Sequence, residues 1–425
     1  GRRNCGIEEG NRSRVHKGRG KHTYTRQVVR EKNMQFSFNV LLGLLGTISF
    51  ASAASFDLHY VPPRDGMSAE ERHAAVADHL SKRIASGVYA GLGNETGVDK
   101  RSRTASMDLG SNSNGDVWAV KAKFGSNEAE QTMILDSGYA HTLIAKNSGY
   151  NPDDSDTVKK TGEDFNANFA TGAGNEGTIL RDDVSVGGLT AKALAFGYTD
   201  SHDFSSDDNL NGVLGIALPN HYESAVAFLW HGWHGIVSVL KHQGVTDEAK
   251  YQVTLTKDGG KFSIGEVDDS LYEGELKSVW NLGRFRGMCG FKGSVNGETR
   301  GFVIDTGSPG MMALDSEMRR FLDSLDGVET STNSKTGTVT GKFNCDSPPK
   351  VKINVDGKLD VEIPEDVLTM YDVGDGKCML PFYGFKNVGV FFKFNWLIGA
   401  PFLRQVSYVC DFDSNHMQIA KQASN

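Results

Sequence analysis

Short runs of alternating apolar and polar residues recur along most of the chain, and Gly, Asn or Asp separates one run from the next. Strongly helical periodicity is rare. Alternation with a period of two is typical of strands that bury one face, and Gly, Asn and Asp favour the turns between them. The pattern therefore predicts a mainly all-β fold.

The strand-rich body contains one pattern twice. An apolar strand leads into Asp-Ser-Gly at residues 136–138 and into Asp-Thr-Gly at residues 305–307. Each half later has two apolar residues followed by a glycine, Gly215 or Gly399, which lie 79 and 94 residues after the respective Asp. A repeat of this length predicts two related lobes from one ancestral unit rather than a solenoid.

We expect these lobes to span residues 102–260 and 261–425. If the two turns face each other at the lobe interface, Asp136 and Asp305 meet there. Two like charges at short distance cannot both ionise easily, so the pair shares a proton over the acidic range. The ionised member can take a proton from water while the protonated member donates to a peptide carbonyl. This chemistry needs neither a metal nor a cofactor.

The neighbours of each Asp suit this role. Gly138 and Gly307 allow tight turns that point a carboxylate inward. The hydroxyls of Ser137 and Thr306 can bond to the backbone of the opposing turn and hold the pair rigidly. A single Asp-Ser-Gly or Asp-Thr-Gly is usually an ordinary β-turn, so the duplicated context carries the prediction.

Over roughly residues 115–425, the chain resembles the pepsin-like aspartic peptidases. Besides the two Asp turns, the segments that agree in order with that family are residues 116–125, 165–172, 211–216, 262–274 and 396–404. The resemblance implies a bilobal fold whose active-site cleft lies between two β lobes. It also implies an endopeptidase whose partners are extended peptide or protein substrates.

The resemblance assigns further residues. Phe169, Thr171 and Gly172 fall in the segment similar to the flap that folds over the cleft. Ser308 matches the residue that bonds the outer oxygen of the second Asp. Cys345 and Cys378 are placed like the cysteines that form the disulfide of the C-terminal lobe.

Three departures from the family concern the first Asp turn and the flap segment. Tyr139 stands where the family usually has Ser or Thr, and Phe169 where a flap Tyr is usual. The Trp that partners this Tyr has no counterpart near Leu143 and Ile144. The flap Tyr and its Trp partner are absent together, so neither would leave the other's polar group unsatisfied. These departures put the catalytic rate in question. The alternative to an active peptidase is a weak or inactive relative that acts as a binding module.

The charge of the chain is uneven. The 425 residues carry a formal net charge of -8. Residues 1–33 hold ten Lys or Arg against three Asp or Glu, which gives +7; residues 34–101 add about -1, and residues 102–425 are near -14. An acidic body repels phosphate, so we expect no nucleic-acid partner. The acidity suits a protein that works in acid, or serves solubility alone. We also expect a monomer.

The segments before the body predict secretion. Residues 1–33 precede Met34, and we expect them to be an over-extended gene model without ordered structure. Residues 34–53 have a short apolar run and end in Ala-Ser-Ala, which indicates a signal peptide; an N-terminal membrane anchor is the alternative. Residues 54–101 end in Lys-Arg and are interpreted as a propeptide. The mature form is then extracellular, with no membrane segment.

Two groups of residues leave alternatives open. Cys289 and Cys410 can pair with each other or remain as buried thiols. Four histidines between His221 and His242 include an i, i+3 pair that could bind metal, but no acidic or Cys ligand lies at suitable spacing. Aromatic packing is the interpretation adopted, and no metal site is predicted.

Overall fold

The computed structural model describes residues 104–112, 114–168, 174–200, 210–218, 235–284, 287–386 and 395–424. The expected gene-model extension, signal peptide and propeptide lie outside the described residues. The flap residues Phe169, Thr171 and Gly172 and the histidines His221, His231 and His234 also lie outside them.

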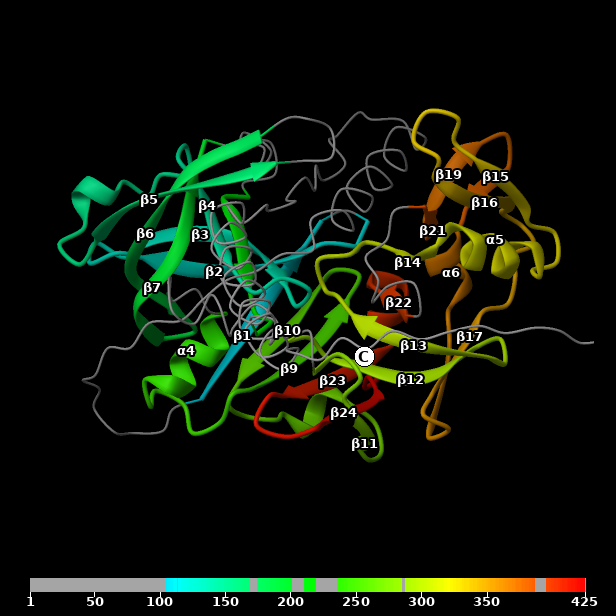
Figure 1. The fold of residues 1–425 in the computed structure, drawn as a ribbon. Coiled ribbons are helices and arrows are strands. Elements are labelled where there is room, and N and C mark those ends of the chain that lie inside the picture. Colours follow the sequence, from blue (N-terminus) through cyan, green and yellow to red (C-terminus); the bar gives the residue numbers. More distant parts are fainter. Residues whose placement is uncertain are drawn as a thin grey trace, which may run out of the picture. The chain divides into compact units, whose positions relative to one another are not determined.

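The described strands form two sheets (Figure 1). In spatial order, the 13 strands of the first sheet are β11 (Lys277–Trp280), β24 (His416–Lys421), β23 (Val406–Asp411), β9 (Lys250–Thr256), β10 (Gly259–Ile264), β1 (Ala105–Ser111), β2 (Trp118–Phe124), β3 (Ala129–Asp136), β8 (Gly212–Gly215), β4 (Thr142–Ala145), β7 (Leu189–Thr199), β6 (Gly174–Val186) and β5 (Lys159–Asn168). This sheet combines most of the first half of the body with the end of the second half.

The second sheet belongs to the second half. In spatial order, its strands are β18 (Leu359–Glu362), β17 (Lys352–Val355), β12 (Gly290–Val295), β13 (Glu298–Ile304), β22 (Asn395–Ile398), β14 (Met311–Leu314), β21 (Phe382–Phe385), β16 (Val339–Asn344), β20 (Lys377–Met379) and β19 (Tyr371–Gly374), with β15 (Glu329–Thr332) beside β16. The helices are α4 (Ile236–His242), α5 (Asp315–Asp323), α6 (Glu365–Leu368) and α7 (Ala400–Leu403), and the 3-10 turns are η1 (Pro152–Asp154) and η2 (Asp269–Leu271).

The two halves repeat one strand arrangement. β8 is parallel to β3 and antiparallel to β4, while β22 is parallel to β13 and antiparallel to β14. The parallel pairs β4–β7 and β14–β21 extend the correspondence. The prediction of a mainly β protein built from two related lobes is confirmed.

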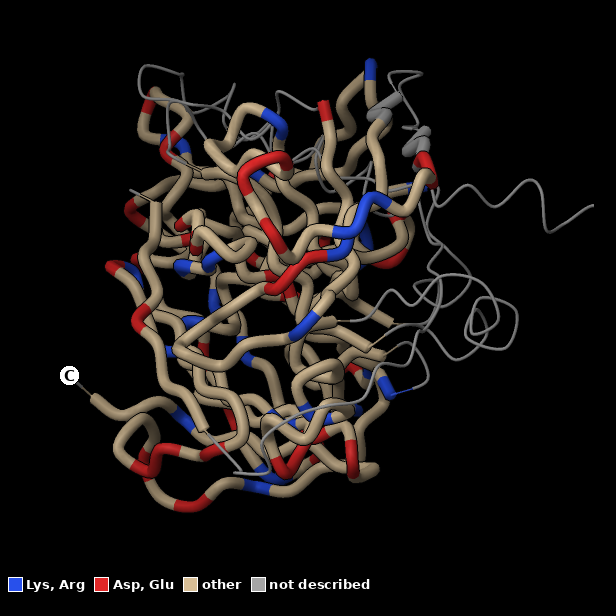
Figure 2. Tube along the Cα trace, turned by 90° about the vertical axis from the view of Figure 1, so that its left-hand side faces the viewer, with Lys and Arg blue, Asp and Glu red and all other residues tan. Residues whose placement is uncertain are grey.

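The alternation in the sequence explains individual strands. In β2, Trp118, Val120, Ala122 and Phe124 are buried, whereas Lys121 and Lys123 face solvent. Across the β2–β3 ladder these lysines form ion pairs with Glu130 and Glu128 at 3.3 and 2.6 Å. Figure 2 likewise shows basic positions beside acidic ones over much of the trace. Exposed pairs of this kind keep the strand face soluble but add little stability.

The α5 helix follows the 3.6-residue period instead. Met318, Phe321 and Leu322 are its buried residues, at the i, i+3, i+4 spacing of an amphipathic helix. Asp315 and Glu317 lie in its first turn, where carboxylates interact favourably with the helix dipole. This helix packs on β14, β16 and β21 and covers part of the second sheet.

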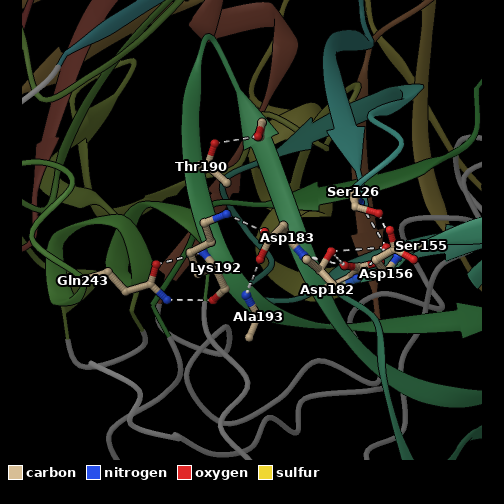
Figure 3. A network of polar contacts seen from close by, with 11 residues as sticks. Ser126, Ser155, Asp156, Asp182, Asp183, Thr190, Lys192, Ala193 and Gln243 are labelled. Atoms are coloured by element: carbon tan, nitrogen blue, oxygen red, sulfur yellow. Dashed lines mark hydrogen bonds and ion pairs between the residues drawn. The ribbon is translucent and has the colours of Figure 1, made fainter. Parts of the chain in front are cut away.

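A polar network fixes a bulge in the first sheet (Figure 3). The ladder between β6 and β7 shifts register between Asp182 and Val184. At the bulge, Asp183 accepts a hydrogen bond from Ala193 N at 3.1 Å and pairs with Lys192 Nζ at 2.6 Å. Ala193 has φ +49°, a left-handed conformation that costs free energy for a non-glycine residue. The Asp183 side chain therefore stabilises a backbone turn that the ladder alone would not hold.

Among the described residues, no helix has the length and apolar character needed to cross a membrane.

Candidate active site

Asp136 and Asp305 occupy matching places in the repeated arrangement. Asp136 is the last residue of β3 and lies beside Gly215 of β8. Asp305 follows β13 directly, and its backbone N donates to Ile398 O of β22 at 3.1 Å. The two side chains belong to residues that are only 4% and 0% exposed. Both Asp residues therefore lie where a strand ends beside its parallel neighbour, in a setting where water is largely excluded.

Reciprocal hydrogen bonds join the two turns. Ser137 N donates to Thr306 Oγ1 at 2.9 Å, and Thr306 N donates to Ser137 Oγ at 3.0 Å. The residues are 169 positions apart in sequence, yet each hydroxyl accepts from the other turn's backbone. The structure thus brings the Asp turns together across the repeat and holds them in a fixed relation.

The second bond of each hydroxyl differs between the two sides. Thr306 Oγ1 donates to Leu135 O at 2.7 Å, a short and well-formed hydrogen bond. The equivalent bond from Ser137 Oγ to Ile304 O is long, at 3.5 Å. The connection is therefore reciprocal in its pattern but unequal in its strength.

Each carboxylate is also oriented by its own turn. Gly138 N donates to Asp136 Oδ1 at 2.9 Å, and Gly307 N donates to Asp305 Oδ1 at 3.0 Å. A backbone N–H directed at one carboxylate oxygen fixes the side-chain rotation and leaves the second oxygen for other partners. The two predicted glycines thus supply matching donors to the two candidate catalytic residues.

The outer oxygens have different neighbours. Ser308 Oγ donates to Asp305 Oδ2 at 2.8 Å, which is the bond that the resemblance implies. The corresponding residue in the first turn is Tyr139, which is 6% exposed. Its ring packs edge-on against the His141 ring, with centroids 5.4 Å apart and an interplanar angle of 80°. The first turn is therefore supported by aromatic packing where the second has a hydroxyl.

Gly215 and Gly399 stand where the backbone comes closest to the turns. A Cβ on Gly215 would lie 2.4 Å from His141 O, and one on Gly399 would lie 2.0 Å from Ser308 O. Real Cβ atoms essentially never come so close to another heavy atom. The apolar-apolar-Gly motif of each half is thus a packing requirement of its Asp turn.

The expected flap corresponds to a hairpin. β5 pairs with β6 from Lys159 to Asn168, and the last described pair joins Asn168 to Gly174. Phe169, Thr171 and Gly172 fall between these two strands in the sequence and lie outside the described residues, so their assignment stays a prediction.

Two disulfides are present in the described part of the chain. Cys345 and Cys378 are linked, as the resemblance implies. Cys289 and Cys410 form the second bridge, which resolves the alternative that the sequence left open. Cys289 precedes β12 in the second sheet and Cys410 lies in β23 of the first, so this bridge connects the two sheets.

No group of three His, Cys, Asp or Glu side chains in the described ranges is arranged to hold a metal ion. His221, His231 and His234 lie outside the described ranges, so the prediction that they bind no metal stays a prediction.

Two groups near the interface were not singled out from the sequence. Burial raises the pKa values of Tyr251 and Tyr408, the Asp305 charge adds to this effect, and the Ser137 hydroxyl opposes it. Asp116 is fully buried and bonded to Tyr371. The alternation of buried positions places Tyr251 and Tyr408 in strands, but it does not indicate which distant residues they lie near.

The repeated Asp turns, their reciprocal bonds and the two-lobed β arrangement define an aspartic peptidase fold. The family model for eukaryotic aspartyl proteases matches residues 95–422, and the chain belongs to this family. It is 51% identical to a probable inactive secreted aspartyl protease of Malassezia globosa, over 92% of this chain and 100% of that protein.

Other relatives are more distant. The chain is 29% identical to secreted aspartyl protease 1 of Malassezia globosa, over 77% of this chain and 79% of the relative. It is 25% identical to an acid protease of Saccharomycopsis fibuligera, over 91% and 99% of the two chains. These relatives therefore include proteins named as proteases and one named as probably inactive.

Proposed function

We propose that this chain is a secreted aspartic endopeptidase that hydrolyses peptide bonds in extended substrates at acidic pH. The observation that carries the proposal is the reciprocal bonding of Ser137 and Thr306, because it joins the two buried Asp turns directly to each other. Secretion is supported by the names of the two Malassezia globosa relatives.

The proposed mechanism uses only the chain's own groups and a water molecule. One of Asp136 and Asp305 is ionised and takes a proton from the water, whose oxygen attacks the peptide carbonyl carbon. The protonated partner donates its proton to the carbonyl oxygen, so a neutral tetrahedral intermediate forms. Its collapse transfers a proton to the amide nitrogen and breaks the C–N bond. The backbone donors at Gly138 and Gly307 hold the carboxylates in place throughout.

A second candidate function is a binding protein with little or no catalytic activity. Two observations favour this function. Tyr139 takes the place in the first turn that the donor Ser308 has beside Asp305 in the second turn. The relative with 51% identity is named as a probable inactive protease. In this case the cleft would bind an extended peptide without cleaving it.

The test compares three forms of the chain, each freed of residues before about position 102. The rate of cleavage of an acid-unfolded protein is measured at about pH 4, with and without a statine-type inhibitor. Asp305→Asn should lower the rate by roughly 10²-fold to 10⁴-fold, the usual contribution of a general acid–base group. Asp326→Asn, which changes an exposed Asp, is the matched control and should keep the parent's rate.

Two results would reject the peptidase proposal: an inactive parent, or activity that survives Asp305→Asn. If the inactive parent still binds a statine-type inhibitor, measured by calorimetry, the binding-module function takes its place.

A further inference from the structure

Two buried tyrosines lie on adjacent strands of the first sheet. Tyr251 belongs to β9 and Tyr408 to β23, and the antiparallel register pairs Tyr251 with Cys410 and Tyr408 with Val253. Because Tyr408 and Cys410 are two residues apart, both tyrosines point to the same face of the sheet. They are 0% and 1% exposed, and their ring centroids are 6.0 Å apart.

The rings sit in an apolar environment. Phe262 and Phe412 pack against Tyr251, with ring centroids 6.1 and 5.8 Å away. Within the described part of the structure, neither phenol oxygen makes a hydrogen bond of standard geometry. A phenylalanine would fill the same space without burying a polar atom, and a buried hydroxyl that lacks good bonds destabilises the fold. Packing alone therefore does not account for the two hydroxyls.

The Ser137 hydroxyl is a polar group that acts on both phenols. Burial raises the pKa of Tyr408, while the hydroxyls of Ser137 and Tyr251 act in the opposite direction. Burial also raises the pKa of Tyr251, and Ser137 again opposes the effect. The charged groups that act on the phenols are Asp305, on both rings, and Asp136, on Tyr408. The Ser137 hydroxyl of the first turn and the Asp305 carboxylate of the second therefore both act on the two buried phenols.

The longer of the two hydroxyl-to-carbonyl bonds belongs to Ser137. Ser137 Oγ is 3.5 Å from Ile304 O, whereas Thr306 Oγ1 is 2.7 Å from Leu135 O. The Ser137 proton is therefore weakly engaged by Ile304 O, and the neighbouring phenol oxygens offer it an alternative acceptor. Ser137 Oγ also accepts from Thr306 N, so any change at this hydroxyl reaches the second Asp turn.

We propose that Tyr251 and Tyr408 are positioning residues for the Asp pair, which share the Ser137 hydroxyl and through it set the relation between the two turns. The expected effect on kcat and on the pH profile rests on the proposed peptidase function. The expected effect on the contact between the two turns does not.

The experiment replaces each tyrosine by phenylalanine, singly and together, in the processed chain. Tyr150→Phe is the matched control, because Tyr150 is also buried but its hydroxyl donates to Asp182 at 2.8 Å. The first readout is hydrogen exchange of the Thr306 amide, followed by NMR, which needs no turnover. The second is kcat and KM as a function of pH.

In the double variant we expect Thr306 amide exchange to accelerate by about tenfold relative to the amides of β13. We expect kcat to fall about 3-fold to 10-fold with KM changed less than about twofold, and the pH profile to move. The control should lose stability without these changes.

Unchanged Thr306 exchange in a folded double variant would overturn the inference. An unmoved pH profile and kcat in an active enzyme would overturn its catalytic part. If the parent cleaves nothing while Thr306 exchange responds as expected, the proposed function fails and the positioning role stands.

Discussion

Ser137 and Thr306 perform the same structural task with side chains that differ by one methyl group. Thr306 Oγ1 takes part in bonds of 2.9 and 2.7 Å, whereas Ser137 Oγ takes part in bonds of 3.0 and 3.5 Å. All four hydrogen bonds are buried, so the loss of a hydroxyl leaves its bonding partners unsatisfied. The two residues should therefore contribute unequally to stability.

We predict that Thr306→Val lowers the free energy of unfolding by about 2–4 kcal/mol and Ser137→Ala by about 1–2 kcal/mol. Urea unfolding, followed by fluorescence at a pH where the chain is stable, measures both. Equal losses, or a larger loss for Ser137→Ala, would contradict the unequal bonding.

The residue pattern revealed part of this site in advance. The Asp-(Ser/Thr)-Gly turns and their apolar strands identify Asp136 and Asp305 as partners, because a duplicated motif implies equivalent places in two lobes. The sequence does not reveal Tyr251 or Tyr408, because any tyrosine in an alternating strand looks like a core residue. Their role depends on their interaction with the Ser137 hydroxyl, which is distant in sequence, and only the tertiary structure brings such residues together.

At the scale of elements, two glycines decide how closely strand ends approach the Asp turns. Gly399 follows β22 and meets the backbone of Ser308 and Gly310, with Cβ distances of 2.0 and 2.5 Å to their carbonyl oxygens. Gly215 and Gly399 belong to equivalent places of the repeat, since β22 lies between β13 and β14 as β8 lies between β3 and β4.

We predict that Gly399→Ala destabilises the chain by roughly 3–5 kcal/mol, since backbone atoms would have to move. Gly110→Ala is the control: Gly110 lies in β1 with nothing within 4 Å of a Cβ, and its effect should stay within about 0.5 kcal/mol. Thermal unfolding of the two variants gives the comparison, and similar melting temperatures would show that the turn tolerates the extra atom.

The whole molecule is joined by a buried carboxylate as well as by the Asp turns. Asp116, before β2, accepts from Tyr371 Oη of β19 and from Asn112 Nδ2, both at 2.7 Å. These strands belong to different sheets. Burial raises the pKa of Asp116, although the two hydrogen bonds and the Arg404 charge oppose this. The net result is a carboxyl that holds its proton more tightly in the folded chain than in the unfolded one.

The sign of the pH dependence follows from the raised pKa. The contribution of Asp116 to stability is complete below its unfolded value of 3.8 and is lost as the pH rises through the folded value. We predict that Asp116→Asn, which can still accept from Tyr371, reduces the fall in stability between about pH 4 and pH 7. Relative to the parent, the variant should lose less unfolding free energy over this range, by about 1.4 kcal/mol for each unit by which folding raises the pKa of Asp116.

Melting temperatures across this pH range, for the parent, Asp116→Asn and the exposed-site variant Asp326→Asn, provide the check. Parallel curves for the parent and Asp116→Asn would show that other groups govern the loss of stability.

The bridge between Cys289 and Cys410 has a practical consequence for anyone who produces this protein. It spans 121 residues of sequence and ties β23 of one sheet to the residue before β12 of the other. A link of that span contributes on the order of 5 kcal/mol by restricting the unfolded chain. Thiols stay reduced in a bacterial cytosol. Recombinant material from that compartment would lack the link, so an inactive preparation could reflect the expression host rather than the sequence. Export through an oxidising compartment is therefore the appropriate starting point for any assay.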